Sequence, residues 1–451
     1  MSQTLAYFQK LLTNVQKGIW PYVATLAHVL IGTILVYFSP RSTFAFLVLV
    51  TSFFSLYYLN ANNRFKLITG IVLALIIIPI LGVRNIFYLE IIFQISVFAA
   101  LALGLNIIVG FAGLLVLGYV AFYAVGAYLW GFFGSQQYYV MSFAPGTQPA
   151  NLPFLLPGDA FYLFLILAII VAALTGILIG LPVMRLRGDY LAIVTLGFGE
   201  VIRVLANNLD KPVNLTNGPQ GITPIQRPSL PDSVINGFNN LFGGIVGHPV
   251  DKASLYNVMF YILALIIIII IVVVTKNLED AKIGRAWAAI REDETAAVAM
   301  GIPIVKMKLM AFAIGASFAG AMGALVAASR TFVSPESFSF MQSIGVLSMV
   351  ILGGLGSIPG VILGAATVVI LNLQILQGFS LYLSQLRQSD AIIPIINFAW
   401  RDLSAQLDPA KYQRLLFGTI LVLMMIFRPD GLIPAARRKR KLISETTEIK
   451  E

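Results

Sequence analysis

Long runs of apolar residues without a charged side chain are the feature that most limits what this chain can fold into. Residues 260–274, for example, read FYILALIIIIIIVVV. A bilayer core needs about 20 mostly apolar residues per helix, so runs of this kind indicate transmembrane spans. Only 11% of the residues are charged and 58% are hydrophobic, whereas a soluble chain is about a quarter charged. The sequence excludes a soluble globular domain and predicts an all-α, polytopic transmembrane helical bundle.

The apolar segments predict about ten to twelve spans of the length that a bilayer requires. The two segments beside residues 353–360 are short, which is typical of a broken or re-entrant element. The segments cover approximately residues 20–38, 43–59, 67–81, 86–109, 113–133, 161–182, 190–205, 258–275, 307–329, 343–352, 359–375 and 415–427.

The net charge of +10 is explained by the loops that flank these spans. Basic residues gather around residues 64–66, 185–187 and 276–308 and in the tail at 437–441, whereas residues 134–160 contain no Lys or Arg. Because basic residues accumulate in cytoplasmic loops, we expect both termini to be cytoplasmic and residues 207–257 to be extracytoplasmic. No basic cluster is interleaved with aromatic residues on a soluble segment, so nucleic acid is not an expected partner.

Signatures of enzymes and metal sites are missing from the sequence. There is no cysteine, and His28 and His248 are the two histidines. No G-x-x-x-x-G-K-[ST] phosphate loop, G-x-S-x-G elbow or H-E-x-x-H motif occurs, so the usual nucleophile, proton-transfer and nucleotide-binding chemistry has no residues to carry it. We expect this chain to be no enzyme and to bind neither a metal nor a cofactor itself.

Ionisable residues inside apolar segments are costly and usually have a reason. Glu90 lies near the start of one predicted span, and Glu200 and Arg203 lie in another. Residues three apart share a helix face, so Glu200 and Arg203 are able to pair. A local ion pair near the membrane boundary and a role in a translocation pathway both remain open for them.

Small residues recur every four positions in residues 307–329, at Gly315, Ala319, Gly323 and Ala327. In lipid, this spacing lets helix backbones approach closely. The pattern predicts that this helix lies inside the bundle.

Residues 276–308 form a charged stretch between two predicted spans, KNLEDAKIGRAWAAIREDETAAVAMGIPIVKMK. Apolar residues recur in it at roughly helical spacing, which predicts short amphipathic helices. By itself, the stretch fits a cytosolic loop that rests on the protein as well as it fits a docking element.

Four stretches, taken together and in this order, resemble the permease subunits of bacterial ABC importers of the branched-chain amino acid family, of the LivM type. They are residues 103–118 (LGLNIIVGFAGLLVLG), 186–200 (LRGDYLAIVTLGFGE), 284–292 (GRAWAAIRE) with Ala296, Ala297 and Gly301, and 353–360 (GGLGSIPG) with 427–432 (FRPDGL). The resemblance covers about residues 86–434.

The resemblance implies an ATP-driven importer for branched-chain or other neutral amino acids in the bacterial inner membrane. Such a permease lies in membrane lipid and pairs with a second, related permease subunit and two cytosolic ABC ATPases, which bind ATP and Mg²⁺. An extracytoplasmic binding protein delivers the substrate. A sister group carries urea and short amides, which stays open as an alternative, as does an ion-driven secondary carrier of a different class.

The resemblance also assigns candidate site residues. The ATPase-coupling residues would be Gly284, Arg285, Ala286, Ile290, Arg291, Glu294, Ala296, Ala297 and Gly301. The pathway residues would be Asn106, Gly110, Gly113, Gly118, Glu200, Gly353 and Gly356. The sequence departs from the family's usual E-A-A-x-x-x-G motif, because Thr295 stands at the acidic position and Glu294 comes one residue earlier.

The predicted domain organisation has three parts. Residues 1–85 form an N-terminal cytoplasmic segment with extra spans, residues 86–434 form the permease core with the coupling loop 276–308, and residues 435–451 form a basic, then polar, cytoplasmic tail. The segment between Gln377 and Arg414 is an insertion that the resemblance leaves unexplained.

Overall fold

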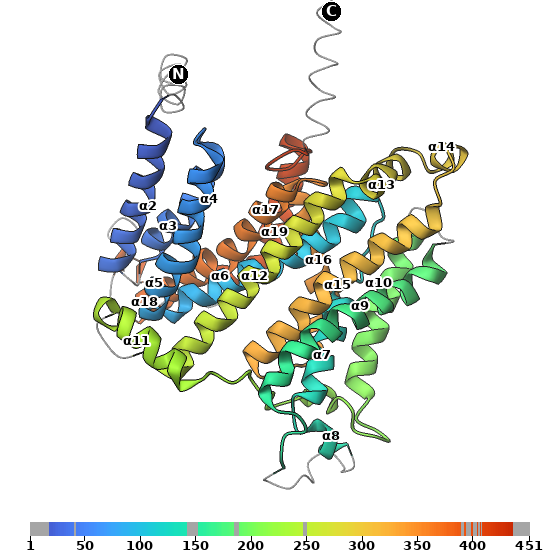
Figure 1. Ribbon diagram of the computed structural model, residues 1–451, viewed down its shortest axis with the longest axis horizontal. Coiled ribbons are helices and arrows are strands. Elements are labelled where there is room, and N and C mark those ends of the chain that lie inside the picture. Colours follow the sequence, from blue (N-terminus) through green and yellow to red (C-terminus); the bar gives the residue numbers. More distant parts are fainter. Residues whose placement is uncertain are drawn as a thin grey trace, which may run out of the picture. The chain divides into compact units, whose positions relative to one another are not determined.

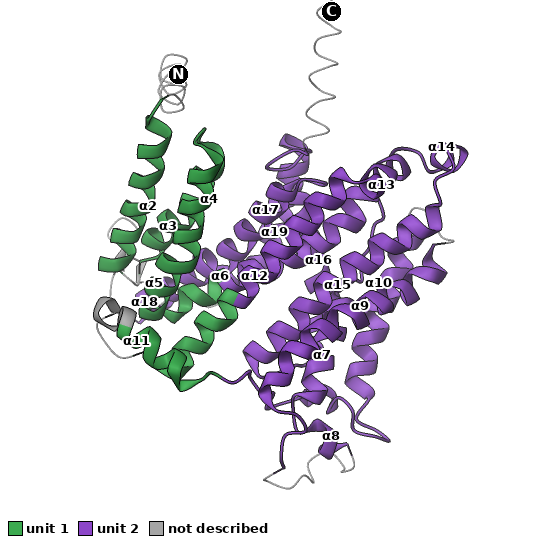
Figure 2. Ribbon diagram, in the orientation of Figure 1, with its two compact units in different colours: residues 1–92, 230–262 green, residues 93–229, 263–451 purple. Residues whose placement is uncertain are grey.

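The structure is a computed structural model that describes residues 18–39, 42–141, 152–184, 189–246, 250–388, 392–393, 398–399, 404, 406 and 408–435. The chain forms two compact units (Figure 2). Unit 1 contains residues 1–92 and 230–262, and unit 2 contains residues 93–229 and 263–451. His248, residues 185–188 and the basic tail at 437–441 lie outside the described residues.

Most described residues are helical. Within the described residues, nine helices are long enough to span a bilayer, and three shorter apolar helices accompany them. The predicted polytopic helical bundle is therefore confirmed. The division into residues 1–85, 86–434 and 435–451 stays a prediction.

Unit 1 is a small cluster of helices. It contains α2 (Trp20–Phe38), α3 (Thr43–Tyr58), a bent helix made of α4 (Asn63–Val72), η1 (Leu73–Ile77) and α5 (Ile78–Arg84), the start of α6 (Ile86–Asn106), α11 (Asp232–Val246) and the start of α12 (Lys252–Asp280). Helix α2 lies close against α3, because a Cβ added at Gly32 would be 2.9 Å from the Leu49 Cα. The Tyr261 hydroxyl donates to the Ala74 carbonyl at 2.8 Å, where the π-helical turn of η1 changes the backbone bonding.

Unit 2 contains the remaining elements (Figure 1). Its first half holds the rest of α6, η2 (Ile107–Phe111), α7 (Val120–Phe133), α8 (Gln137–Val140), η3 (Gly158–Ala160), α9 (Phe161–Val183), α10 (Asp189–Asn208) and η4 (Gly218–Gln220). The rest of α12, α13 (Lys282–Glu292), α14 (Glu294–Ala299), α15 (Ile304–Arg330), η5 (Pro335–Phe338), α16 (Phe340–Gly353), α17 (Ile358–Ile370), η6 (Leu371–Leu376), α18 (Gln377–Arg387), η9 (Pro409–Tyr412) and α19 (Gln413–Phe427) follow. Strands β1 (Ile392–Ile393) and β2 (Phe398–Ala399) pair antiparallel.

Helix α15 forms the centre of unit 2, as the repeat of small residues predicts. A Cβ added at Gly323 would be 2.1 Å from the Tyr123 carbonyl oxygen on α7, and one at Gly320 would be 2.3 Å from the Ala172 Cβ on α9. Any side chain at these two positions would force the helices apart. In lipid, van der Waals contact between closely packed helices stabilises the bundle, because hydrophobic burial does not drive helices together there. The prediction that this helix is internal is confirmed.

The structure differs from the sequence prediction in the segment after α6. The apolar run 113–133 suggests a continuous span, but α7 begins only at Val120, and residues 112–119 contain no helical turn. At the start of this non-helical stretch, Gly113 has a φ of +73°, which an α-helix does not allow, so the preceding helix ends there. At the other end, Gly118 lies so close to α10 that an added Cβ would be 1.9 Å from the Thr195 carbonyl oxygen. We call residues 112–119 the extended segment.

A second broken element is the pair α16 and α17, which meet at the turn of residues 354–357. Gly354 and Gly356 have φ values of +117° and +83° there. The Ser357 hydroxyl caps α17 by accepting from the Gly360 amide at 3.2 Å. Helices α17, η6 and α18 continue as one 30-residue helix, so the first part of the unexplained insertion after Gln377 extends a span.

The end of unit 2 that includes α8 is built from bonded loops. Gln137 on α8 donates its amide to the Asn214 backbone carbonyl at 2.8 Å and to the Asn214 side chain at 3.1 Å. The Ser229 amide donates to the Asp159 carboxylate at 3.0 Å, and the Ser229 hydroxyl donates to the same oxygen. Residues 209–229 therefore form an ordered loop that is held to the neighbouring elements.

Candidate functional site

The amphipathic stretch after α12 folds into α13 and α14, which lie at the end of unit 2 opposite α8 (Figure 1). Helix α13 buries Gly284, Trp287 and Ile290, three residues at helical spacing. The Asp293 side chain caps α14 by accepting from the amides of Thr295 at 2.7 Å and Ala296 at 3.0 Å. The stretch thus forms two short helices, as its periodicity predicts.

Glycine ends α14 and turns the chain into α15. Gly301 has a φ of +77°, and its amide donates to the Val298 carbonyl at 2.9 Å, while the Ile302 amide donates to the Ala297 carbonyl at 3.0 Å. This left-handed C-terminal turn favours glycine. Ala297 is buried inside the chain itself, whereas Val298 and Met300 expose 58% and 82% of their surface.

Trp287 anchors α13 to the membrane helices. Its indole is fully buried, and its Nε1 donates to the Met307 carbonyl at 2.8 Å in the first turns of α15. A buried Trp needs a partner for its N–H, so this contact fixes both the position and the rotation of α13.

A buried ion pair holds α14 to α15. The Lys308 Nζ lies 3.0 Å from the Glu294 carboxylate, and the side chains expose 3% and 31% of their surface. An ammonium buried to this degree requires a charge partner. Glu294 is the acidic residue that stands one position earlier than in the usual motif, and its partner is thus within this chain.

Arg291 reaches from α13 to both broken elements. Its guanidinium donates to the Gly110 carbonyl at the end of η2. A Cβ added at Gly113 would be 2.9 Å from the Arg291 Cγ, and one added at Gly356 would be 3.5 Å from the Arg291 Nη1. The glycines leave room for this side chain, which lies against the start of the extended segment and the turn between α16 and α17.

Asn106 joins the two broken elements to each other. It is fully buried, and its side-chain oxygen accepts from the Gly356 amide at 2.8 Å, although the two residues are 250 positions apart in the chain. A Cβ added at Gly110 would be 2.1 Å from the same Asn106 oxygen. A cavity of about 300 Å³ adjoins this cluster, and its lining includes Gly110, Gly284, Arg291 and Gly356. We call Asn106, Gly110, Gly113, Arg291 and Gly356 the arginine cluster.

The extended segment ends inside the bundle, at the N-terminus of α7. The Leu117 amide donates to the Thr195 hydroxyl at 3.2 Å, and the Val120 amide donates to the Ser343 hydroxyl on α16 at 3.2 Å. Non-helical backbone at membrane depth is tolerated where it is buried in protein or lines a cavity. These hydroxyls satisfy amides that a continuous helix would have bonded to itself.

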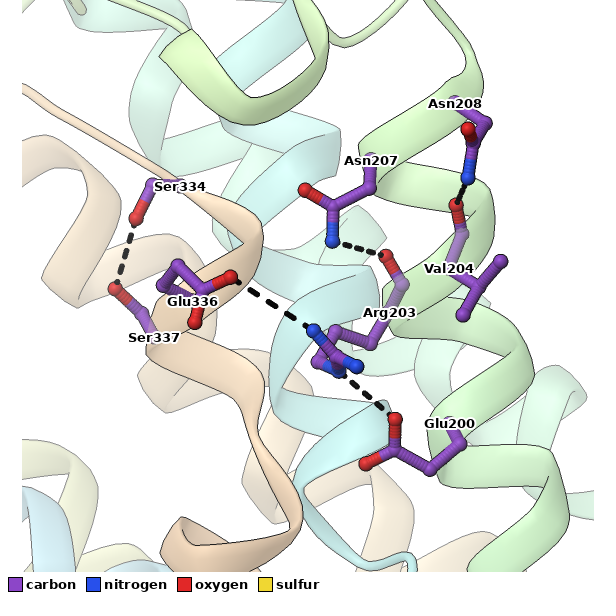
Figure 3. A network of polar contacts seen from close by, with 8 residues as sticks. All are labelled: Glu200, Arg203, Val204, Asn207, Asn208, Ser334, Glu336 and Ser337. Carbon is purple, nitrogen blue, oxygen red and sulfur yellow. Dashed lines mark hydrogen bonds and ion pairs between the residues drawn. The ribbon is translucent and has the colours of Figure 1, made fainter.

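Glu200 and Arg203 form the predicted pair, and a third charge joins it (Figure 3). The Arg203 Nε donates to the Glu200 carboxylate at 2.8 Å. The Arg203 Nη1 also lies 3.7 Å from the Glu336 carboxylate on η5. The network ties α10 to the loop after α15. With more than a quarter of each side chain exposed, it contributes about 1 kcal/mol or less per pair.

The structure brings some of the predicted site residues together and separates others. Three predicted pathway residues, Gly110, Gly113 and Gly356, lie against Arg291, which is predicted for coupling, and a fourth, Asn106, bonds to Gly356. Arg285 and Ala296 are exposed, Ala286 is half-buried, and Gly353 packs against α17, where an added Cβ would be 2.3 Å from the Gly360 carbonyl oxygen. The roles of all these residues stay predictions.

Sequence reasoning missed Lys308, Thr195 and Ser343. Lys308 is one of several basic residues in its loop, and nothing in the sequence singles it out for burial. Thr195 and Ser343 lie in apolar segments, where a hydroxyl often bonds to its own helix. The one signal in the sequence that could have pointed to these residues was a polar side chain within an apolar span.

A helical bundle with broken helices at its centre and an amphipathic helical loop docked at one end has the architecture of a membrane permease. The chain belongs to the family of branched-chain amino acid transport system permease components, whose model matches residues 87–425. It is therefore a multi-pass membrane protein.

Similar proteins carry the same description. The chain is 39% identical over 357 residues to the high-affinity branched-chain amino acid transport system permease protein LivM of Salmonella typhimurium, which covers 77% of this chain and 70% of that protein. LivM of Escherichia coli is 38% identical over 355 residues, with the same coverage. LivH of Escherichia coli is 28% identical over 127 residues, 28% of this chain and 41% of that protein. No solved structure matches the chain.

Proposed function

We propose that the chain is a permease subunit of an ATP-driven ABC importer that carries branched-chain and other neutral amino acids across the bacterial inner membrane. A second, related permease subunit completes the pathway, and two cytosolic ATPases bind ATP and Mg²⁺ and supply the energy. An extracytoplasmic binding protein delivers the substrate. The chain is similar to both LivM and LivH, and both are described as permease proteins of a high-affinity branched-chain amino acid transport system. This double similarity supports the pairing of two related permeases.

The observation that carries the proposal is the docked loop with an exposed apolar tip. Helices α13 and α14 are held by Trp287, by the Glu294–Lys308 pair and by Arg291, yet Val298 and Met300 face outward. Exposed apolar residues on a rigidly held helix suit a protein contact. Val298 and Met300 offer the ATPases a contact surface. Because the three contacts named above hold the loop to the membrane helices, a displacement of that surface also displaces those helices.

The arginine cluster gives this movement a path to the centre of the bundle. A displacement of α13 pulls Arg291 against the Gly110 carbonyl and the Gly356 turn. The extended segment begins two residues after Gly110, and at its other end Leu117 is bonded to α10 and the following Val120 to α16. Coupling between two sites needs such an element with two arrangements, and a non-helical segment between two helices is suited to that role.

This proposal sets the orientation of the chain. The loop at 276–308 lies in the cytoplasm, the end of unit 2 that includes α8 and η5 faces outward, and both termini are cytoplasmic. The excess of basic residues in the loop supports this orientation.

Co-purification tests the proposal directly. When a tagged chain is expressed together with the products of its neighbouring genes, it is expected to bring down a second permease and nucleotide-binding subunits. The Met300→Asp variant is expected to lose the nucleotide-binding subunits but to keep the second permease. Val213→Asp is a matched control, because Val213 is also exposed and apolar but lies at the end of unit 2 that includes α8. A wild-type chain that brings down no nucleotide-binding subunit, yet takes up amino acid alone under an ion gradient, would show a secondary carrier instead.

A further inference from the structure

A cavity of about 440 Å³ lies at the end of unit 2 opposite the docked loop. Helices α6, α7, α15 and α16 and the turn η5 surround it. Its volume lies within the roughly 300–1,000 Å³ that is usual for small-molecule sites. None of the candidate site residues predicted from the sequence lines it.

The cavity has one charged residue and largely apolar walls. Among its lining residues, Arg330 at the end of α15 is the one charged side chain, and none is acidic. Gln94 on α6 and Gln342 on α16 are polar, and Val97, Phe98, Val326 and Phe338 are apolar. The Phe338 ring packs against two tyrosine rings: its centroid lies 5.3 Å from that of Tyr123 and 5.7 Å from that of Tyr128.

We propose that this cavity binds the transported amino acid, an inference that rests on the proposed function. The carboxylate of the amino acid pairs with the Arg330 guanidinium, which favours planar bidentate contacts with carboxylates. The amide oxygens of Gln94 and Gln342 accept from its ammonium group. An aliphatic side chain fills the space between Phe98 and Val326, where burial of each methylene contributes about 0.8 kcal/mol.

A second cavity continues the first one along α16. It has a volume of about 420 Å³ and shares Gln94, Phe98 and Gln342 with the first cavity. It extends to Ser348 on α16 and to Asn372, which lies in the π-helical turn η6. Turns of this kind occur frequently at functional sites. The two cavities give the bound amino acid a route toward the end of α16 that contacts the arginine cluster.

The lining predicts selectivity. A side chain with a positive charge is repelled by the Arg330 guanidinium, which carries the same charge. A hydroxylated or amidated side chain loses hydrogen bonds with water against the apolar wall. Urea and short amides have no carboxylate, so that Arg330 gives them no charge pairing. The cavity therefore favours leucine, isoleucine and valine over lysine, serine and urea.

Uptake by the complete transporter in proteoliposomes tests the site. Arg330→Gln is expected to raise the KM for leucine about 10- to 100-fold, the factor that the loss of a hydrogen bond to a charged group brings, and Arg330→Lys is expected to restore most of the affinity. Val326→Trp is expected to block leucine uptake by filling the cavity. Lys211→Gln is the control, because Lys211 is exposed and does not line the cavity. Assembly of the complex is expected to stay unchanged in all four variants, and Lys211→Gln is expected to keep the wild-type rate of basal ATP hydrolysis.

Cysteine labelling separates binding from a merely structural role. The natural chain contains no cysteine, so Val326→Cys carries the one thiol. Millimolar leucine is expected to slow its reaction with a water-soluble maleimide at least threefold, while the exposed Thr223→Cys reacts at the same rate with and without leucine. If the wild-type complex transports leucine but Arg330→Gln keeps its KM and leucine gives no protection at Val326→Cys, the site is wrong and the proposed function stands. If the wild-type complex moves no amino acid at all, both are overturned.

Discussion

The ion pair between Glu294 and Lys308 offers the sharpest test of how the loop is held. Lys308 lies in the second turn of α15 and exposes 3% of its side chain, and its Nζ is 3.0 Å from the Glu294 carboxylate. Glu294→Ala leaves this ammonium without a charge partner where little water reaches it. The expected result is an α14 that opens away from α15.

The size of the effect follows from the burial of the two groups. Removing one partner of a buried ion pair costs about 3–5 kcal/mol. Glu294 exposes 31% of its side chain, so water can enter part of its place, and we expect a smaller cost, about 2–3 kcal/mol. Lys308→Met keeps the volume and removes the buried charge, so the double variant is expected to recover about 1–2 kcal/mol.

Limited proteolysis of the loop measures this free energy. Cleavage of a locally opened segment tracks the population of the open form when opening is fast. A cost of about 2–3 kcal/mol raises that population roughly 30- to 150-fold, and the rate of trypsin cleavage after Arg291, a site that every variant keeps, should rise in proportion. Asp280→Ala is the control, because Asp280 is an exposed acidic residue of the same loop. Equal cleavage rates in Glu294→Ala and Asp280→Ala would refute the reasoning, as would a double variant cleaved as fast as Glu294→Ala.

Three further predictions concern coupling and orientation. Arg291→Ala removes the bond to the Gly110 carbonyl and is expected to lower leucine uptake per ATP hydrolysed about tenfold, as the loss of a hydrogen bond to a charged group would; a normal ratio in proteoliposomes would exclude the arginine cluster as the path of coupling. Ala297→Asp buries an unpaired charge, and Gly301→Trp forces a bulky residue to a φ of +77°. Both are expected to abolish ATP-driven uptake while the chain still inserts, and retained ATPases with full transport would show that this loop is not the coupling element. A cysteine at the exposed Gln220 is expected to react with a membrane-impermeant reagent in intact cells, and reaction only after permeabilisation would contradict the proposed orientation.

Most of the fold follows from local patterns that a sequence displays directly. The apolar runs locate the spans because the thickness of a bilayer sets one length for every helix. The small residues at Gly315 to Ala327 identify the central helix, and the spacing of Glu200 and Arg203 predicts their pair, because both depend on helix geometry alone. The helices of the loop are likewise visible in its periodicity.

The site depends on contacts that no local pattern contains. Asn106 bonds to Gly356 across 250 residues, and Arg291 meets Gly110 only because α13 docks beside the end of η2. The extended segment reads as a helix in the sequence, since its residues are as apolar as those of its neighbours. Its backbone can leave the helix because Thr195 accepts from the Leu117 amide and Ser343 accepts from the amide of Val120, the residue that follows the segment.

The sequence by itself determined that the chain crosses the membrane many times, which helix lies at the centre and which loop forms short amphipathic helices, because these properties depend on composition and spacing along one helix. The tertiary structure alone decided that the apolar run 113–133 is interrupted, which lysine is buried and where a cavity opens beside Arg330. Those outcomes depend on which side chains distant parts of the chain bring to the same place, and hydrogen-bond and charge partners are chosen by that arrangement.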